Sequence, residues 1–536
     1  MAFASRFVVP IAFSAVLTLA GCGGGNGTSK PTPPPSGAFS NASLSGTYTF
    51  SVAGANGSGI FAMAGTFAAC GCVQGTISSG TVDLNDPTGP AIAAAIGSNS
   101  TYRITSDGRG LARLFITIPG SSATEIDLDL VLTSSSHGSV IRFDGFGTGS
   151  GTIDLQSNAV IAANLTATPY AFFLSGGDLN NLPVTTAGAL SVGSTGTIIT
   201  GVEDFNYNGT PSTQLALTGS ITLGSGTNPG QAVLTTSGTT PRSLGFSVYV
   251  IDATHLKLIE NDGQFVLIGD LLAQPSTSIS AGALAFTMSG LNSNSDLFVT
   301  GGVMLSDGVS LLTNGAEDVN DAGLVDNGTS PAAPFAFNGS FSSTGDGRFQ
   351  VSLTNYVGGT TFAAYPSVGG LLMLQVDSLG GGITAGIALP QQPDATISAS
   401  QGYGLNLSGE DLSTFVEIDQ LAEVKTTTSE MTGLVDQNDG GQFGTVNVRG
   451  TYSVGAGFVS ATFNSGLPNL FLYPIDSSTS LLITADSTVA ALGSFQIQST
   501  PGSAAQASLR RASTVPMPRI LPHQRSAKPK TRVGSN

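Results

Sequence analysis

The chain of 536 residues contains no tryptophan, three cysteines, three histidines and only 10% charged residues. Because tryptophan is missing, the Cys-Trp-Cys pattern of an immunoglobulin-like sandwich is missing too. The same absence counts against the stacking of sugar rings, although tyrosine can substitute. Few charges together with many Gly, Ser and Thr residues favour many short strands joined by turns.

Motifs typical of enzymes are also missing. The chain has no G-x-S-x-G nucleophile elbow, no H-E-x-x-H zinc motif and no phosphate-binding Gly-Lys-Ser/Thr loop. His137 and His255 fall at equivalent turns of the first two repeats described below, without counterparts in the other repeats, and His523 stands near the end of the chain. Since a repeated active site would not lose its imidazole in half of its copies, we expect a protein that is not an enzyme.

Basic residues are scarce and unevenly placed. Of the 18 Lys and Arg residues, Arg6 lies in the leader and seven follow Gln506, which leaves ten against 34 acids and a body charge near −24. Such a surface repels nucleic acid, so we expect no nucleic-acid partner. The segment 500–536 has no acids and no periodic apolar pattern, which predicts a basic disordered tail. A contact of this tail with anionic cell-surface polymer or with the acidic body is the alternative.

The leader is an apolar stretch from Phe7 to Leu19 that ends in Leu19-Ala20-Gly21-Cys22. About 13 apolar residues are too few to cross a bilayer, which needs roughly 20. The four residues resemble the lipobox of bacterial lipoproteins, and that resemblance implies a signal peptide at 1–21, cleavage before Cys22 and acylation of its thiol. More than one acyl chain gives a durable anchor. Gly23 is not the aspartate that resembles a retention signal, so we expect the outer membrane or cell surface, with a Gly/Pro-rich tether at 22–43.

Four internal repeats organise the rest of the chain. The opening strand recurs at Tyr48, Tyr170, Leu284 and Tyr403, with spacings of 122, 114 and 119 residues. Closing glutamines follow at Gln156, Gln274, Gln391 and Gln498. These marks predict β units at 44–156, 165–274, 281–392 and 398–498. The pattern resembles uncharacterised tandem β-repeat surface lipoproteins, a resemblance that implies no activity.

Apolar residues within a unit alternate with a period of two. Tyr48, Phe50 and Val52 alternate with Thr49 and Ser51, as in a half-buried antiparallel strand. Turns predict seven or eight strands per unit, joined by short hairpins. The predicted fold class is all-β, with four tandem antiparallel β-meander units. Each unit is expected to be a small up-and-down barrel, because closure removes exposed edges, and a β-sandwich is the alternative.

A G-x-x-D-x-N pattern recurs about 30 residues into each unit. In the second unit it continues as D-x-N-x-N-G, which resembles the first half of a calcium loop but lacks the downstream Glu. One interpretation is a hairpin turn in which Asp and Asn bond their own backbone, and the other is a calcium site. The residues concerned are Asp83, Asn85, Asp204, Asn206, Asn208, Asp318, Asn320, Asp436 and Asn438.

Cys70 and Cys72 lie two residues apart in the first unit. Partners at this spacing on a regular strand would strain a disulfide, but Gly71 between them could relieve the strain in a turn. A disulfide and two free buried thiols are both open, and two thiolates alone make a poor zinc site.

These observations predict a non-catalytic lipid-anchored surface protein with a structural or adhesive role, no cofactor beyond a possible calcium ion, and an unknown protein or glycan partner. The alternative is a module whose lipocalin-like barrels bind a small ligand or a glycan. Hollow unit interiors would favour the alternative, and filled interiors would favour the structural role.

Overall fold

The structure, a computed structural model, describes residues 39–499 except 119, 121, 158–164, 166–168, 225, 239–240, 293–294, 326–333, 379–381 and 456. Cys22, the predicted signal peptide, most of the tether and the basic tail lie outside the described residues. The described part consists of strands and one 3-10 turn, η1 (Asn41–Ser43), and none of it forms an apolar helix long enough to span a bilayer. The prediction of an all-β fold is confirmed.

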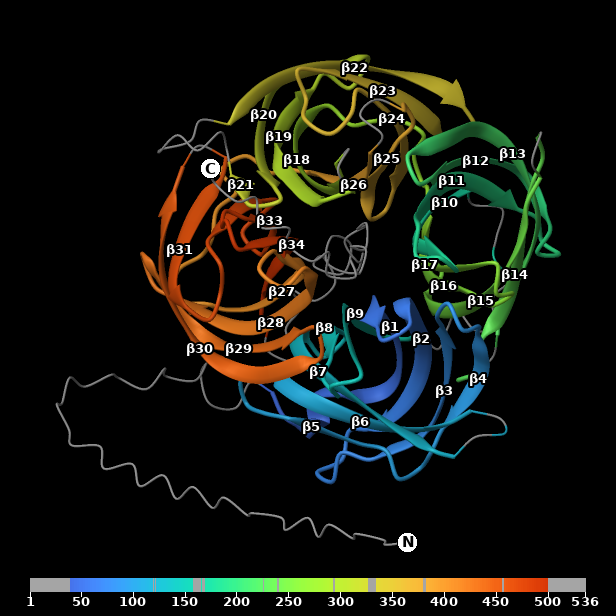
Figure 1. Ribbon diagram of the computed structural model, residues 1–536, viewed down its shortest axis with the longest axis vertical. Helices are drawn as coiled ribbons and strands as arrows, with labels where there is room; N and C mark the ends of the chain where they lie inside the picture. Colours follow the sequence, from blue (N-terminus) through green and yellow to red (C-terminus); the bar gives the residue numbers. More distant parts are fainter. Residues whose placement is uncertain are drawn as a thin grey trace, which may run out of the picture. The chain divides into compact units, whose positions relative to one another are not determined.

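The first barrel consists of strands β1 to β9, drawn in blue and teal in Figure 1. Its strands pair with their neighbours in sequence except β4 and β5, which stand at the two ends of the sheet and both pair with β6. The pairing of β1 with β9 and the short pairing of β4 with β6 complete the barrel. Its strands are β1 (Ser45–Asn56), β2 (Gly59–Cys70), β3 (Ile77–Asn85), β4 (Ala91–Ile96), β5 (Thr101–Ile104), β6 (Arg109–Thr117), β7 (Thr124–Ser134), β8 (His137–Arg142) and β9 (Gly147–Leu155).

The second barrel is a closed sheet of eight strands in sequence order. They are β10 (Pro169–Asp178), β11 (Pro183–Val192), β12 (Ile198–Tyr207), β13 (Thr210–Thr222), β14 (Gly230–Thr236), β15 (Ser243–Asp252), β16 (His255–Glu260) and β17 (Phe265–Ala273).

The third barrel closes through β18 with β26 and β19 with β20, while the short β21 pairs only with β20. Its strands are β18 (Gly282–Leu291), β19 (Leu297–Ser306), β20 (Leu311–Asp321), β21 (Leu324–Val325), β22 (Phe335–Gly345), β23 (Arg348–Thr354), β24 (Thr361–Ser367), β25 (Gly370–Gln375) and β26 (Ile383–Pro390).

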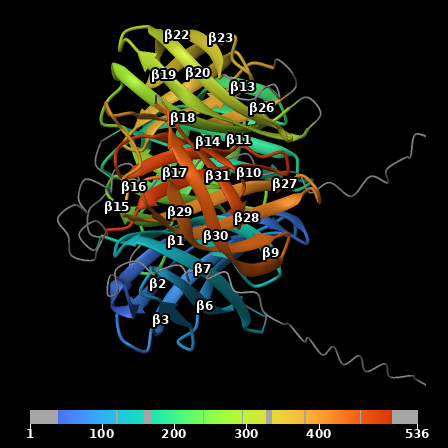
Figure 2. The same cartoon turned by 90° about the vertical axis from the view of Figure 1, so that its left-hand side faces the viewer.

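The fourth barrel is again a closed sheet of eight strands in sequence order. They are β27 (Gly402–Asp411), β28 (Val416–Thr426), β29 (Glu430–Asp439), β30 (Gln442–Val454), β31 (Val459–Ser465), β32 (Leu470–Pro474), β33 (Thr479–Thr484) and β34 (Val489–Ile497). In every barrel the first strand pairs antiparallel with the last. The up-and-down barrel is therefore confirmed over the sandwich, and the strands run obliquely in Figure 2, as barrel closure requires.

The period of two places one face of each strand inside its barrel. In β1, Tyr48, Phe50 and Val52 belong to the apolar cluster of the first barrel, and similar clusters fill the other three interiors. The outward face is not always exposed. Thr49 is buried and donates its hydroxyl hydrogen to the carbonyl of Val250 in the second barrel at 2.8 Å. Strands against another barrel are thus buried on both faces, whereas strands such as β14 alternate between buried and exposed residues.

A glycine at the same position of the last strand in each barrel lies close to the backbone of the first strand. On Gly151, an added Cβ would lie 1.7 Å from the carbonyl oxygen of Ser51, too close for any side chain. Gly269, Gly386 and Gly493 occupy the same place in the other barrels, each five residues before the closing glutamine. The repeat therefore requires glycine here for strand approach rather than for a turn.

Candidate functional site

The G-x-x-D-x-N residues lie in strands rather than in turns. The aspartate and the following asparagine sit in β3, β12, β20 and β29, where all eight side chains are buried. Only Asn208 of the second unit lies in a turn, with a φ of 48°. The hairpin-turn interpretation is therefore wrong for the aspartates, because they belong to outward strand faces that another barrel covers. It holds in part for Asn320 and Asn438, whose Oδ1 atoms accept from the backbone N–H groups of Gly323 and Gly441 in the turn that follows, at 2.9 Å each.

Each asparagine donates its side-chain amide to the backbone of the next barrel. The bonds run from the first barrel to the second, the second to the third, the third to the fourth, and the fourth to the first. They are Asn85 to Glu260 O (3.0 Å) and Phe265 O (2.9 Å), Asn206 to Gln375 O (3.1 Å), Asn320 to Thr484 O (3.1 Å) and Val489 O (2.9 Å), and Asn438 to Arg142 O (2.7 Å) and Gly147 O (2.8 Å).

The closing glutamines make bonds in the same direction. Each donates its amide to a carbonyl of the next barrel, and the last glutamine returns to the first barrel. The bonds are Gln156 to Val250 O (2.9 Å), Gln274 to Gly347 O (2.9 Å), Gln391 to Pro474 O (2.6 Å), and Gln498 to Asp107 O (2.7 Å) and Leu132 O (3.0 Å). We call the contact regions between consecutive barrels seams. The seams form a closed head-to-tail cycle.

The aspartates meet donor side chains across the same seams. Asp204 accepts from Arg348, Nε to Oδ2 at 2.6 Å and Nη2 to Oδ1 at 3.0 Å, and also from the hydroxyl of Tyr365. Asp318 accepts from the hydroxyl of Tyr473 at 2.8 Å. The sequence pattern identified the aspartates but not their partners, because the partners come from the following repeat.

At the first seam, Asp83 lies beside Tyr249 of the second barrel, and burial raises the pKa of both groups. Apolar contacts complete this seam. Ile60 and Ala62 of β2 pack with Ile259 and Val266 of the second barrel. Burial of such side chains supplies most of the attraction, and the polar bonds select one register.

The fourth seam, between the fourth and the first barrel, differs from the others because several acidic side chains lie close together in it. Asp436 pairs with Arg109 of the first barrel at 3.2 Å, and the buried Asp129 lies beside it. Burial, followed by the charge of Asp436, raises the pKa of Asp129 to about 8. Nearby, burial and then the charge of Asp107 raise the pKa of Glu423 to about 8. This seam therefore retains protons at neutral pH.

The second seam occupies the Asp204 carboxylate that a calcium ion would need, although the Oδ1 atom of Asn206 has no hydrogen-bond partner among the described residues. Both carboxylate oxygens of Asp204 already bond Arg348, and the Asn206 amide nitrogen faces the third barrel. Among the described residues, no three His, Cys, Asp or Glu side chains gather to hold a metal ion. Calcium binding stays a prediction, and the arrangement favours a folding role for these residues.

The two histidines begin equivalent strands, His137 in β8 and His255 in β16. His137 Nδ1 lies 2.7 Å from Asp154 Oδ1, and His255 Nε2 lies 2.5 Å from Asp270 Oδ1. The fully buried Lys257 also bonds Asp270, at 3.3 Å. Burial alone would raise the pKa of Asp154, but His137, Lys257 and His255 hold it below its ordinary value. Sequence reasoning missed this buried polar cluster, because its members come from four strands of two barrels, β8, β9, β16 and β17.

Cys70 and Cys72 are joined by a disulfide with an S–S distance of 2.08 Å. Gly71 between them has a φ of 63°, and its N–H donates to the hydroxyl of Tyr102 at 2.9 Å. The bridge closes the end of β2, away from the histidine cluster. It is a local structural link of the first barrel.

Comparisons with known proteins add little to this geometry. No protein-family model matches the chain, and no curated protein matches it. Among solved structures, the chain is similar to isotype 1 transferrin binding protein B from serogroup B Neisseria meningitidis, with 11% identity over 65% of this chain and 78% of that chain. The TM-score of 0.16 is too low to carry an argument.

Proposed function

We propose that this protein is a non-catalytic, lipid-anchored protein of the outer membrane or cell surface, with a structural or adhesive role. The observation that carries the proposal is the closed cycle of seams. The asparagines that recur in all four repeats bond the next barrel. Polar residues that join the barrels to one another suit a rigid protein body, and such a body can present its outer surface to a partner.

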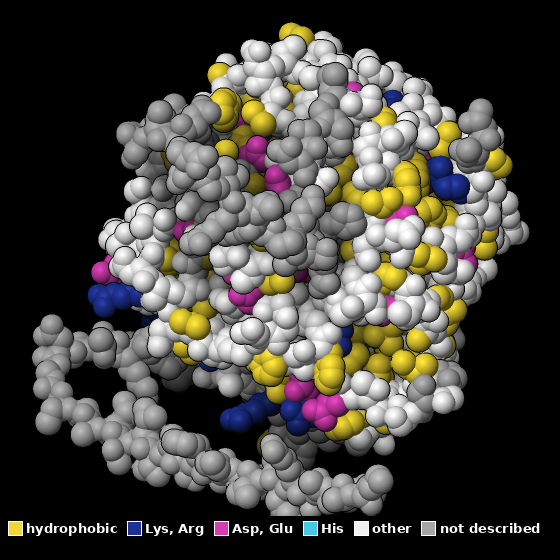
Figure 3. Space-filling model, in the orientation of Figure 1, with side chains coloured by type: hydrophobic (Ala, Val, Ile, Leu, Met, Phe, Trp, Pro, Cys, Tyr) yellow, Lys and Arg dark blue, Asp and Glu magenta, His cyan; other side chains and the backbone are white. Residues whose placement is uncertain are grey.

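The filled interiors support the same role. Apolar side chains occupy the inside of each barrel, so the alternative of a lipocalin-like barrel that holds a ligand has less support. The face in Figure 3 carries scattered charged side chains among mostly uncharged atoms. Such a surface suits contact with a protein or glycan partner better than contact with nucleic acid.

The test is complementation of a deletion strain. Cells lacking the protein receive wild type, Cys22→Ser or Arg348→Met, and surface attachment and detergent sensitivity of the envelope are measured. We expect wild type to restore both properties, and Cys22→Ser to fail because it lacks the acylated thiol. Arg348→Met is expected to fail in proportion to its loss of folded protein. Mass spectrometry of the mature amino terminus checks acylation.

Two outcomes would count against the proposal. Full restoration by an unacylated Cys22→Ser protein would contradict the anchored role. A deletion strain with unchanged attachment and detergent sensitivity would contradict a structural or adhesive role. Arg113→Met, which removes two ion pairs of an exposed arginine, with Glu125 and Asp127, is the matched control for Arg348→Met.

A further inference from the structure

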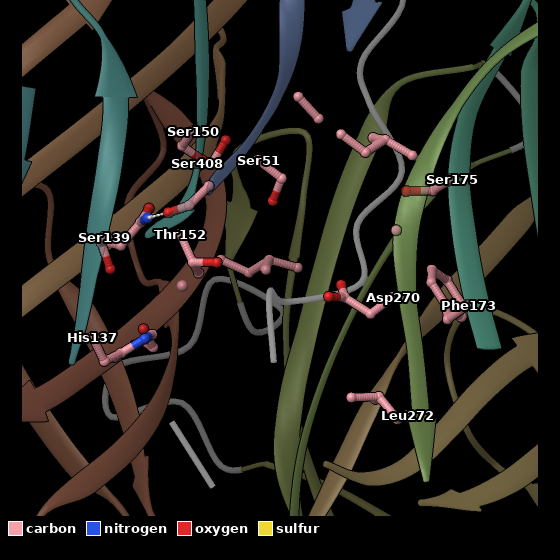
Figure 4. A pocket seen from close by; sticks show the side chains of 18 of the residues that line it. Ser51, His137, Ser139, Ser150, Thr152, Phe173, Ser175, Asp270, Leu272 and Ser408 are labelled. Atoms are coloured by element: carbon pink, nitrogen blue, oxygen red, sulfur yellow. Dashed lines mark hydrogen bonds between the residues drawn. The ribbon is translucent and has the colours of Figure 1, made fainter. Parts of the chain in front are cut away.

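We propose that a cavity between the four barrels binds a small neutral polyol of three or four carbons. This central cavity has a volume of about 90 Å³ and is lined by strands of all four barrels: β1, β8 and β9, β10 and β17, β25, and β27 and β34. It lies outside the barrel interiors, on outward strand faces (Figure 4). It therefore exists only where the cycle of seams is closed.

The wall of the central cavity mixes polar and apolar groups. His137, Ser139 and Thr152 of the first barrel and Ser408 of the fourth contribute polar groups. The side formed by the second barrel in Figure 4 carries Ser175 and Asp270 beside the apolar Phe173 and Leu272. A polyol suits such a wall, because it presents both hydroxyl and C–H groups.

The charges around the central cavity are already paired. The Asp270 carboxylate is in contact with the side chains of His255 and Lys257, and the Asp154 carboxylate is in contact with His137. Of these groups, Asp270 and His137 line the central cavity, whereas Lys257 is fully buried and does not line it. Because the carboxylate at the wall already bonds a cation, the site favours a neutral ligand.

Two buried atoms at the wall have no hydrogen-bond partner among the described residues, His137 Nε2 and Ser408 Oγ. Their residues are 3% and 5% exposed. When His137 donates its Nδ1 hydrogen to Asp154, a neutral ring leaves Nε2 as an acceptor, which requires an O–H or N–H donor. The hydroxyl of Ser408 can donate or accept. A ligand with several hydroxyl groups satisfies both atoms.

The volume of the central cavity limits the number of non-hydrogen atoms in the ligand. A volume of about 90 Å³ holds about six to nine waters at 10–15 Å³ each. Glycerol has about as many non-hydrogen atoms and is the smallest polyol with three hydroxyl groups. Hexoses are larger than this space.

The experiment titrates the full protein with glycerol and follows the ring proton signals of the histidines by NMR. The chain has only three histidines, so His137→Gln and His255→Gln assign the spectrum. We expect a saturable shift of the His137 signal with glycerol and none with propan-1-ol at equal concentration. Ser408→Ala should weaken binding about tenfold through loss of one hydrogen bond, while the exposed Ser429→Ala should leave it unchanged.

Each remaining outcome overturns the proposal. A shift that rises linearly with glycerol, or equally with propan-1-ol, means that the central cavity holds water only. A saturable shift with ammonium chloride but not with glycerol means a cation site instead. Titration of wild type alone distinguishes these cases, so the test does not depend on the folding of the Ser408→Ala protein.

Discussion

Asp204 of the second barrel and Arg348 of the third form a two-bond ion pair at 2.6 and 3.0 Å, with side chains only 0% and 2% exposed. The two residues lie 144 positions apart in the chain. Burying both charges is costly, but the two parallel bonds and the hydroxyl of Tyr365 satisfy the carboxylate. The pair therefore sets the register of the second seam, and each partner depends on the other.

Removal of the cation should destabilise the fold strongly. Arg348→Met leaves Asp204 buried without its partner and should lower the free energy of unfolding by about 3–5 kcal/mol. Urea denaturation measures the loss. Arg113→Met is the control, because Arg113 is 44% exposed in its pair with Asp127, and such pairs contribute about 1 kcal/mol or less. Equal losses in the two variants would refute the importance of the buried pair.

Calcium should not change the stability of the protein. The Asp204 oxygens are engaged at the second seam, so thermal melts of wild type with calcium and with chelator should coincide. Asp204→Ala should melt lower, by the same amount in both solutions. A calcium-dependent rise of the melting temperature in wild type, absent from Asp204→Ala, would establish a calcium site formed by Asp204, Asn206 and Asn208.

The two kinds of asparagine in the repeated pattern should behave differently. Asn320→Ala leaves carbonyls of Thr484 and Val489 without their donor, and should cost about 1–3 kcal/mol. Asn208→Gly changes a turn residue with a positive φ that glycine adopts readily, so its effect should stay within about 0.5 kcal/mol. Chemical denaturation of both variants measures the difference. A larger loss at Asn208 would favour the turn interpretation.

The protein should not tolerate a methyl group at Gly151, where the last strand of the first barrel lies close to the first strand. Gly151→Ala places its Cβ on the carbonyl of Ser51, so β1 and β9 must separate, and the loss should exceed about 4 kcal/mol, the range of large mutational effects. Gly444→Ala in β30 is the control, since an added Cβ there meets no atom within 4 Å. Differential scanning calorimetry gives both values. A normal melting transition for Gly151→Ala would disprove the close approach.

Stability should fall as the pH rises from about 4 to 8. The pKa of Asp129 is raised from 3.8 to about 8 in the folded protein, by burial and by Asp436, while Arg109 opposes the shift. Between these values the folded chain binds a proton that the unfolded chain has lost, so deprotonation favours unfolding. Asp129→Asn should therefore reduce the fall in the urea midpoint between pH 5 and pH 9.

Part of the pH dependence should remain in Asp129→Asn, because the pKa values of Glu260 and Glu423 are also raised to about 8, chiefly by burial. Glu430→Gln, at an exposed position, is the control. An Asp129→Asn protein with the full wild-type pH dependence would contradict the role of Asp129.

The local pattern of the sequence determined the fold of each unit. Alternation at Tyr48, Phe50 and Val52 specifies a strand with one apolar face, and short turns between such strands favour a meander that closes on itself. Repetition of the pattern shows that the closure happens four times. These features depend on neighbours in the chain, so they can be predicted without the tertiary structure.

The tertiary structure alone decided what covers the outward faces. The sequence placed Asp204 and Asn206 in one pattern, but it could not show that Arg348 and Gln375 of the next barrel would meet them. Nor could it show that Gln498 would return to the first barrel at Leu132. The reason is physical: the strand period separates two faces, whereas the partner of the outward face depends on how whole barrels pack. The seams and the central cavity arise only from that packing.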